Sequence, residues 1–303
     1  MLCRIGEVEV WRVLEDDRPV LSLARFFPDL GAEDLARLRP GLVPRAIRPD
    51  PETGEDWLVL PVQSFLLRTP RRTILVDACV GNDKTVPHIP LWTARRDGRF
   101  MAGLAQAGAR VEDVDLVLCT HLHVDHVGWT TRREGDRWVP TFPNARVLTT
   151  AADLARAEAL AEAGPDTTAG HVWRESLAPL VEAGRLEVVE PDAQADPAVR
   201  LRPAPGHTPG HVAVEILAGP GASSGASSGA VITGDLIHSP LQLALPDLCP
   251  SVDADPAQAR ATRRAMLEEL AETRRLALVT HFPLPSAGRV RRAEGAFGWD
   301  DSP

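Results

Sequence analysis

The chain has 303 residues, 44% of them hydrophobic and 25% charged, which is typical of a soluble protein with a substantial core. Its net charge of −9 argues against nucleic acid or an anionic membrane as a partner. The N-terminus, MLCRIGEVEVWRVLEDD, carries charges every few residues and has no signal-peptide core, and no apolar run reaches the roughly 20 residues of a membrane helix.

The first predicted element is a strand over residues 7–14, where apolar and polar side chains alternate. Residues 22–56 are rich in Pro, Arg and Asp with little periodicity apart from a helix-like AEDLARL, and we interpret them as an excursion over the surface. The stretch DWLVLPVQSFLLRTPRRTILVDACVG has two apolar runs around TPRR, which predicts a hairpin. GRFMAGLAQAGA predicts a helix, and DVDLVLCT predicts a short buried strand.

Further along, RWVPTFPNARVLTT predicts strand, turn and strand, and AADLARAEALAEA and VWRESLAPLVEAG have helical spacing. LEVVE, VAVEILA and GAVITGD predict strands, and LALVTHF predicts the final strand. The longest predicted helix begins at Asp255, with Pro256 in its first turn. The Gly/Ser repeat at 221–230 predicts a flexible hairpin tip. Because strands and helices alternate to both ends, we expect one α/β domain over residues 1–303.

Between the predicted strand DVDLVLCT and residue 127, the chain places His121, His123, Asp125 and His126 close together. Neutral imidazole and carboxylate are ligands that Zn²⁺ and similar cations prefer. His121 and His123, two apart in an extended loop, can share one ion, whereas Asp125 and His126 can turn toward a second. A solvated, histidine-rich turn is the alternative interpretation.

Three more ligand types follow predicted strands. His207 lies in the Gly/Pro-bounded APGHTPGH, Asp235 follows the apolar VITG, and His281 ends LALVTH. The two oxygens of Asp235 could bridge two cations. Strand ends that each deliver a ligand are expected to meet at one edge of a sheet, which favours a metal site over a solvated turn.

The pattern His121-x-His123-x-Asp125-His126, followed by His207, Asp235 and His281, resembles the metallo-β-lactamase-fold superfamily from about residue 77 to residue 281. The resemblance implies an α/β fold of the αββα four-layer sandwich type, with two divalent metal ions at the edge of its sheets. Zn²⁺ is favoured, with Mn, Co or Fe as alternatives. By this resemblance, one ion has the ligands His121, His123 and His207, the other has Asp125, His126 and His281, and Asp235 bridges them. Asp77 is implied to support the ligand loop, and we expect a structural or supporting role for His211.

The resemblance also implies a hydrolase that uses a metal-bridging hydroxide. ILVDACVGNDK, LCTHLHVDHVGW, GDLIHSPLQ and THFPLPSAGR look like the lactonase and organophosphate-hydrolase branch, so we expect a lactone or carboxylic ester as substrate. Lactonases of this branch have a tyrosine three residues after the bridging aspartate, but this chain has no tyrosine and has His238 there. We hypothesise that His238 donates a hydrogen bond to the substrate or leaving group, and that Asp125 or His238 transfers the proton, with Asp235 also catalytic. A histidine that only caps the segment is the alternative for His238.

Two alternative functions stay open: a phosphotriester hydrolase using the same site, and a mononuclear iron oxidoreductase of the same fold. The expected substrate is a small, moderately hydrophobic molecule, bound by the loop after Cys79, the 22–56 segment and the stretch after Asp235. Trp92 and Trp129 are candidates to line its pocket.

Lys84 is interpreted as a solvated residue or a contact to a polar group of the substrate, and His88 and His171 as surface residues. Four scattered cysteines without a CxxC pair favour a reducing, cytoplasmic location. We expect no nucleic-acid or membrane partner, and a homodimer stays open.

Overall fold

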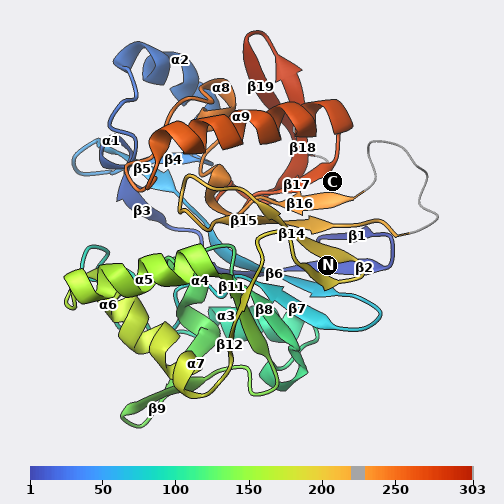
Figure 1. Cartoon of the computed structure of the whole chain (residues 1–303). Helices are drawn as coiled ribbons and strands as arrows, with labels where there is room; N and C mark the ends of the chain where they lie inside the picture. Colours follow the sequence, from blue (N-terminus) through green and yellow to red (C-terminus); the bar gives the residue numbers. More distant parts are fainter. Residues whose placement is uncertain (220–228, 302–303) are drawn as a thin grey trace.

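Two seven-stranded sheets lie face to face in the computed structural model, with helices on both outer faces (Figure 1). The structure describes residues 1–219 and 229–301, so the predicted Gly/Ser tip at 221–230 lies outside the described residues except for its last two positions. Among the described residues, no helix is both long enough and apolar enough to cross a bilayer.

The first sheet contains the predicted hairpin and the strand that precedes the histidine loop. Its order is β1 (Cys3–Ile5), β2 (Val8–Asp16), β6 (Val62–Arg68), β7 (Thr73–Val76), β8 (Leu116–Leu118), β11 (Arg146–Thr150) and β12 (Leu186–Val189). β6 and β7 pair antiparallel, which confirms the hairpin, and β7, β8, β11 and β12 run parallel. The carboxyl ends of these parallel strands therefore meet at one edge.

The second sheet carries the remaining predicted strands and extends beyond them. Its order is β13 (Gln194–Asp196), β14 (Val199–Pro203), β15 (Val212–Ile216), β16 (Ala230–Ile232), β17 (Leu276–Leu278), β18 (Ala287–Ala293) and β19 (Ala296–Asp300). The prediction that LALVTHF is the final strand is wrong, because the hairpin of β18 and β19 follows it. Arginines alternate through β18, so its sequence resembles a polar loop, yet Val290 and Phe297 are buried in the core cluster that includes Met266 and Leu270.

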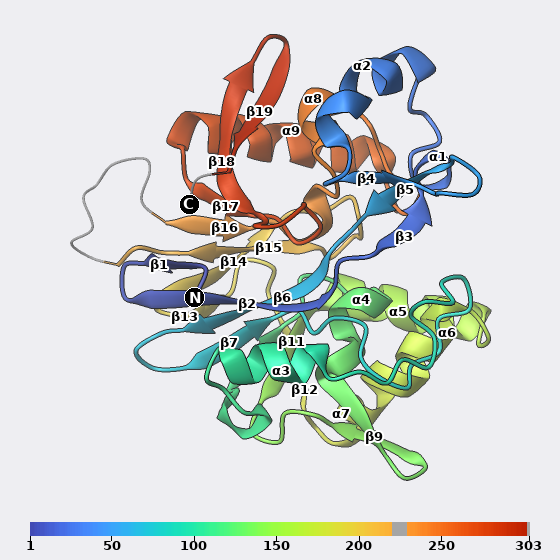
Figure 2. The same cartoon turned by 180° about the vertical axis from the view of Figure 1, so that it is seen from behind.

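Apolar side chains of the two sheets form the central core, exemplified by Phe65 and Leu116 from the first sheet and Val214 and Ile232 from the second. Figure 2 shows the outer layers from behind. The helices of the first sheet are α3 (Arg99–Gln106), α5 (Ala151–Ala163), α6 (Thr168–Val172) and α7 (Ala178–Glu182), and that of the second is α9 (Pro256–Thr273). The αββα sandwich is therefore confirmed.

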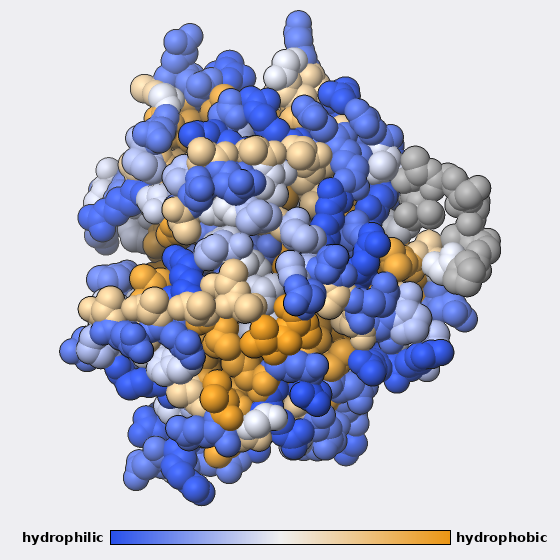
Figure 3. All heavy atoms as spheres, viewed as in Figure 1, coloured by the Kyte–Doolittle hydropathy of each residue, from blue (hydrophilic) through white to orange (hydrophobic). Residues whose placement is uncertain are grey.

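Two local predictions can be compared with the structure in detail. Asp255 begins α9 as predicted, because its carboxylate accepts the N–H groups of Ala257 and Gln258. The strand–turn–strand over 137–150 is present, but β10 (Arg137–Pro140) pairs with β9 (Thr131–Glu134) instead of β11. Figure 3 shows hydrophobic residues gathered on the lower part of this face, around β11 and β12; Val181 of α7 and Val188 of β12 are 50% and 48% exposed.

Residues 19–59 form a structure that we call the cap. It contains β3 (Pro19–Ser22), α1 (Leu23–Phe26), α2 (Ala32–Leu42), β4 (Ile47–Pro49) and β5 (Asp56–Val59), and its sheet has the order β3-β5-β4. The interpretation of 22–56 as a surface excursion with one short helix is therefore incomplete. Phe26, Phe27 and Ile47 are buried in a cluster with Leu241 of α8 (Leu241–Ala244), which brings the cap against the stretch after Asp235.

Candidate metal centre

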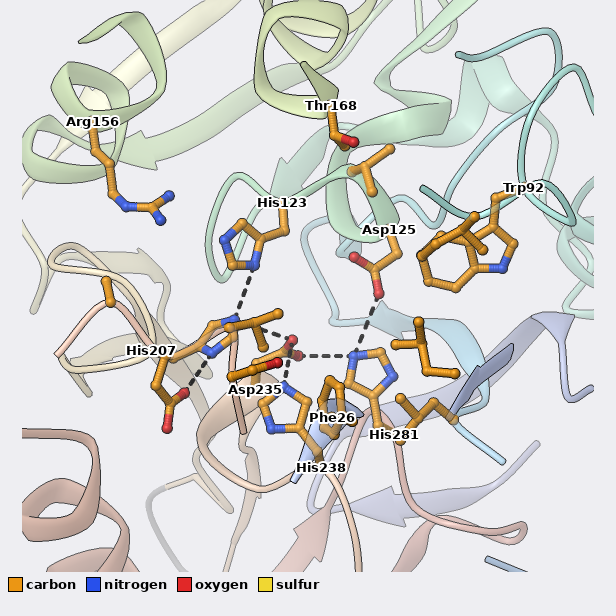
Figure 4. A pocket seen from close by; sticks show the side chains of 18 residues that line it. Phe26, Trp92, His123, Asp125, Arg156, Thr168, His207, Asp235, His238 and His281 are labelled. Carbon is orange, nitrogen blue, oxygen red and sulfur yellow. Dashed lines mark hydrogen bonds and ion pairs between the residues drawn. The ribbon is translucent and has the colours of Figure 1, made fainter. Parts of the chain in front are cut away.

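Four loops at one edge of the sandwich bring all the predicted ligand residues together. Figure 4 shows those that line the pocket: His123, Asp125, His207, Asp235 and His281. They follow β8, β14, β16 and β17, so both sheets contribute. Ligand atoms lie within 4.8 Å of one another in two groups: the first is His121, His123, His207 and Asp235, and the second is Asp125, His126 and His281. These groups match the two sets expected from the sequence. Asp125 and His126 lie in a one-turn helix, α4 (Val124–Val127), and not in a purely extended loop.

The carboxylate of Asp235 lies between the two groups. Its Oδ1 is 3.2 Å from His126 Nε2 and 3.1 Å from His281 Nε2. Its Oδ2 faces the other group, 3.4 Å from His207 Nε2 and 3.7 Å from His121 Nε2. One oxygen therefore faces each group, which is the arrangement that a bridging carboxylate needs.

The first group contains three imidazoles, of which those of His121 and His207 are buried and that of His123 is half-buried. His121 Nε2 and His207 Nε2 each lie 3.0 Å from His123 Nδ1. Burial is the largest cause and lowers the pKa of all three imidazoles well below the usual range, although the charge of Asp235 acts in the opposite direction. Neutral imidazoles with converging nitrogens present lone pairs to a common point, which suits a cation.

The second group carries more negative charge. Burial acts to lower the pKa of His126, but the charges of Asp235, Asp77 and Asp125 outweigh it and raise that pKa well above the usual range. The pKa of His281 is also raised, because Asp235 outweighs the opposing effect of burial. Asp125 Oδ2 lies 3.6 Å from His281 Nε2 and 3.8 Å from His126 Nε2.

The outer nitrogens of three imidazoles are held by hydrogen bonds that point the inner nitrogens at the centre. The Nδ1 atoms of His126, His207 and His281 lie 2.9 Å from Asp77 Oδ2, Asp253 Oδ1 and the carbonyl of Pro61. With a proton on each Nδ1, the lone pair of each Nε2 faces inward.

Two polar atoms at the centre test whether cations fit. His126 Nε2 and Asp235 Oδ1 are buried, and neither has a hydrogen-bond partner among the described residues. Buried polar atoms are rarely left without a partner, so their orphaned state is informative. Divalent cations of the Zn²⁺ type fit this set of imidazoles and carboxylates.

Asp77 and His211 contact the centre from behind. Asp77 also accepts the backbone N–H of Thr120 at 2.8 Å, which fixes the start of the histidine loop. His211 Nδ1 lies 2.9 Å from the carbonyl of Ala204, and His211 Nε2 accepts the N–H of Asp235 at 3.0 Å. Gly234 has φ +54°, and a Cβ there would lie 2.5 Å from His211 Nε2, so only glycine allows this approach.

Two supporting residues were not expected from the sequence. Arg263 of α9 is fully buried and donates to Asp253 Oδ2 at 3.2 Å and to the carbonyl of Leu236 at 2.9 Å. Asp253 in turn holds His207, so α9 is connected to the first group through two side chains. One signal could have identified Arg263: it lies four residues after the buried Ala259 and four before the buried Leu267.

A pocket of about 480 Å³ opens onto the two groups. His238 lies in its wall, with Nε2 3.2 Å from Asp235 Oδ2, and its ring is stacked on His281 at a centroid distance of 5.5 Å. Asp235, His238 and His281 could form a third ligand group. The Nδ1 atom of His238 is buried and has no partner among the described residues.

The other expected pocket residues have different outcomes. Trp92 lines the pocket, whereas Trp129 stacks on Phe100 at 5.1 Å within the core. His88 is exposed and lines a neighbouring hollow, and His171 Nδ1 is half-buried 3.1 Å from Glu175 Oε1.

Neither interpretation of Lys84 is correct, because Lys84 is 2% exposed and does not line this pocket. Its ammonium donates to Thr131 Oγ1 and the carbonyl of Glu175, both at 2.7 Å, and to Ser176 Oγ at 3.0 Å. These acceptors come from β9 and the helical turn after α6, which the sequence could not place beside it.

Comparisons with known proteins agree with this geometry. The family model described as the metallo-beta-lactamase superfamily matches residues 57–281. AidC, a dizinc quorum-quenching lactonase solved with a product, superposes with a TM-score of 0.79 at 21% identity, over 99% of this chain and 96% of that one. The hydrolase AbOPH gives 0.76 at 22% identity over 98% and 95% of the two chains. A probable metal-dependent hydrolase from Staphylococcus aureus gives 0.74 at 18% identity over 99% of each chain. No curated protein matches the chain in sequence.

Proposed function

Because this chain belongs to the metallo-beta-lactamase superfamily and is a metal-dependent hydrolase, we propose that it uses two divalent cations to open a lactone or cleave a carboxylic ester. The observation that carries the proposal is the position of Asp235, with one carboxylate oxygen within 3.2 Å of an imidazole in the second group and the other within 3.4 Å of one in the first. A carboxylate placed in this way can offer one oxygen to a cation in each group, which supports the proposal of two cations.

The proposed ligands follow the two groups. His121, His123 and His207 hold one cation, Asp125, His126 and His281 hold the other, and Asp235 binds both. When bound, Zn²⁺-type cations polarise a carbonyl oxygen and lower the pKa of water toward neutrality.

His238 and Asp125 are the proposed groups for hydrogen bonding and proton transfer. Both line the pocket beside Asp235. The Nε2–H of His238, now 3.2 Å from Asp235 Oδ2, can donate to a substrate oxygen or to the leaving alkoxide. Asp125 is 14% exposed and faces the open pocket, so it can accept a proton from water and return it to the leaving oxygen.

The pocket walls and the neighbouring structures favour a small, moderately hydrophobic substrate. Apolar side chains from the cap and from the loop after Cys79 line one side of the pocket: Leu21, Phe26, Leu60, Ile89 and Trp92. AidC is a lactonase with a comparable fold, and another neighbour is an N-acyl homoserine lactone hydrolase with its product bound. A cytoplasmic location and a homodimer stay predictions.

One observation favours a second candidate, phosphotriester hydrolysis with the same residues. The chain contains no tyrosine, so the hydroxyl expected in the lactonases is replaced by the imidazole of His238. A mononuclear iron oxidoreductase is the alternative of another class. It would leave Asp125, His126 and His281 without a cation, although their atoms converge as closely as those of the first group.

Metal analysis and a substrate panel test the proposal. Purified protein should contain about two equivalents of divalent metal, and lactones should be hydrolysed faster than aryl esters and phosphotriesters of similar size. His238→Ala should keep both metal equivalents but lose roughly 10- to 100-fold in kcat/KM on the best lactone, because one hydrogen bond to a charged oxygen is removed.

Three results would contradict specific parts. A content of one iron ion per chain, together with redox activity, would favour the oxidoreductase over the hydrolase. A phosphotriester hydrolysed faster than every lactone would select the second candidate. Unchanged kcat/KM in His238→Ala would leave this imidazole a structural residue.

A further inference from the structure

Arg156 on α5 lies at the pocket on the side away from the cap. It is half-buried, it lines the pocket, and Figure 4 shows its guanidinium directed toward His123. It is the one Lys or Arg side chain among the described residues that line the pocket.

The guanidinium has no hydrogen bond or ion pair with any residue that the structure describes, and no dashed line reaches it in Figure 4. On its own helix, the positions three and four residues away are Ala152, Asp153, Ala159 and Leu160. The one carboxylate among them, Asp153, is buried and accepts the N–H groups of Leu122 and Gly210. The helix therefore provides no partner for Arg156.

The pocket carboxylates do not serve as partners either. Asp253 accepts from His207 and from the buried Arg263. Asp125 and Asp235 face the imidazoles of the centre. A cation that faces an enclosed space without a carboxylate partner is suited to an anionic ligand.

The walls of the pocket are also segregated by polarity. Arg156 and the hydroxyl-bearing Thr168 come from the neighbouring helices α5 and α6, whereas the largest apolar side chains come from the cap and the loop that carries Trp92. Smaller apolar residues, Val124, Val252 and Ala254, line the pocket elsewhere. Figure 4 shows Arg156 and Trp92 on opposite sides of the imidazole cluster. A substrate that spans the centre would place a polar end at α5 and an apolar end at the cap.

We propose that the substrate is an anionic lactone or ester that carries a carboxylate, and that Arg156 binds this carboxylate while the scissile bond lies over the two ligand groups. The inference rests on the proposed hydrolase function. Because the chain has a net charge of −9, its overall field does not attract such a substrate, so the attraction has to come from local positive charge at the pocket, to which Arg156 contributes.

A matched pair of substrates tests the inference. In γ-valerolactone the ring carbon beside the ring oxygen carries a methyl group, and in γ-carboxy-γ-butyrolactone the same carbon carries a carboxylate. The metal-loaded enzyme should hydrolyse the carboxylate lactone with the lower KM. Arg156→Gln should raise that KM by roughly 10- to 100-fold, the equivalent of one charge-assisted pair, and leave the KM of the methyl lactone within about 2-fold.

Two further variants serve as controls. Arg156→Lys keeps the charge and should restore part of the preference for the carboxylate lactone. Arg71→Gln makes the same change of charge in the exposed turn before β7, at the opposite end of that strand from Asp77, and should alter neither substrate.

The outcomes separate this inference from the function on which it rests. Equal KM values for the two lactones, or an equal loss on both in Arg156→Gln, would overturn the assignment of Arg156. If the metal-loaded enzyme hydrolysed neither lactone, the proposed lactone-opening activity would fail. Hydrolysis of the methyl lactone without discrimination would leave that function intact and remove only the anionic substrate.

Discussion

The two ligand groups share Asp235 and are both rich in imidazole, yet their charge environments are opposite. Burial lowers the pKa of the imidazoles in the first group, so those imidazoles are neutral before any cation binds. In the second group, Asp235 and neighbouring carboxylates raise the pKa of His126 and His281 despite burial. The imidazoles of the first group can thus bind a cation without losing a proton. Those of the second group would have to release protons when a cation binds. For that reason we expect the two positions to differ in affinity for a cation, although they face the same carboxylate.

Removal of Asp235, which both groups share, should have the largest effect and should remove the difference between the two groups. Asp235→Asn replaces a negatively charged carboxylate with a neutral amide, so both positions should lose affinity and kcat/KM should fall by roughly 1000-fold or more. Metal content per chain and lactone hydrolysis measure this. Asp247→Asn, which removes an exposed carboxylate paired with Arg264, is the control. Full activity with two equivalents retained in Asp235→Asn would rule out the bridging role.

Changing the supporting carboxylates should separate the two groups. Asp253→Asn weakens the hold on His207, and Asp77→Asn weakens the hold on His126, so each should lower the affinity of one metal equivalent by roughly 10- to 100-fold. Titration against a chromophoric chelator resolves the two equivalents. Each single variant should keep one tight equivalent and the double variant none. A double variant that still keeps one would show that both carboxylates serve the same position.

Acidification should give the smallest and most gradual difference. Because the pKa of His126 and His281 is raised, protons compete with a cation there near neutral pH, and affinity should fall roughly 10-fold per pH unit for each proton displaced. The first group, whose pKa values are lowered, should hold its cation unchanged over the same range. Metal equivalents retained between about pH 8 and pH 6 measure this. Loss of both metal equivalents at the same pH would contradict the expected difference in pH dependence between the two groups.

The sequence identified the candidate ligands because each follows a strand end, and strand ends converge on a sheet edge whatever the details of packing. The supporting pair of Asp253 and Arg263 has no such local signal. Asp253 lies 46 residues after His207, and Arg263 lies in a stretch of α9 rich in charge, so only the folded chain brings them together. Arg156 likewise faces the pocket because of how α5 rotates against the first sheet.

In the fold as well, some elements could be predicted from the sequence and others could not. Strands that contain a short apolar run, such as FLL in β6 and LAL in β17, were predictable because both of their faces are buried. The β18–β19 hairpin and the cap bury only one face or a few aromatic residues, so polar residues dominate their sequences. Their contribution to the core depends on partners far along the chain, which periodicity does not show.

Each ligand group draws on both sheets: His121 and His123 follow β8, whereas His207 precedes β15, and His126 follows β8 whereas His281 follows β17. A cation bound in either group would therefore crosslink the two sheets at this edge of the sandwich. Away from this edge, the two sheets are joined largely by apolar contacts, which allow the sheets to shift relative to each other more easily than coordination bonds do. Removal of the metal would therefore make this edge of the protein more mobile and also abolish hydrolysis. Addition of the metal would restore the rigidity of the edge and the activity together.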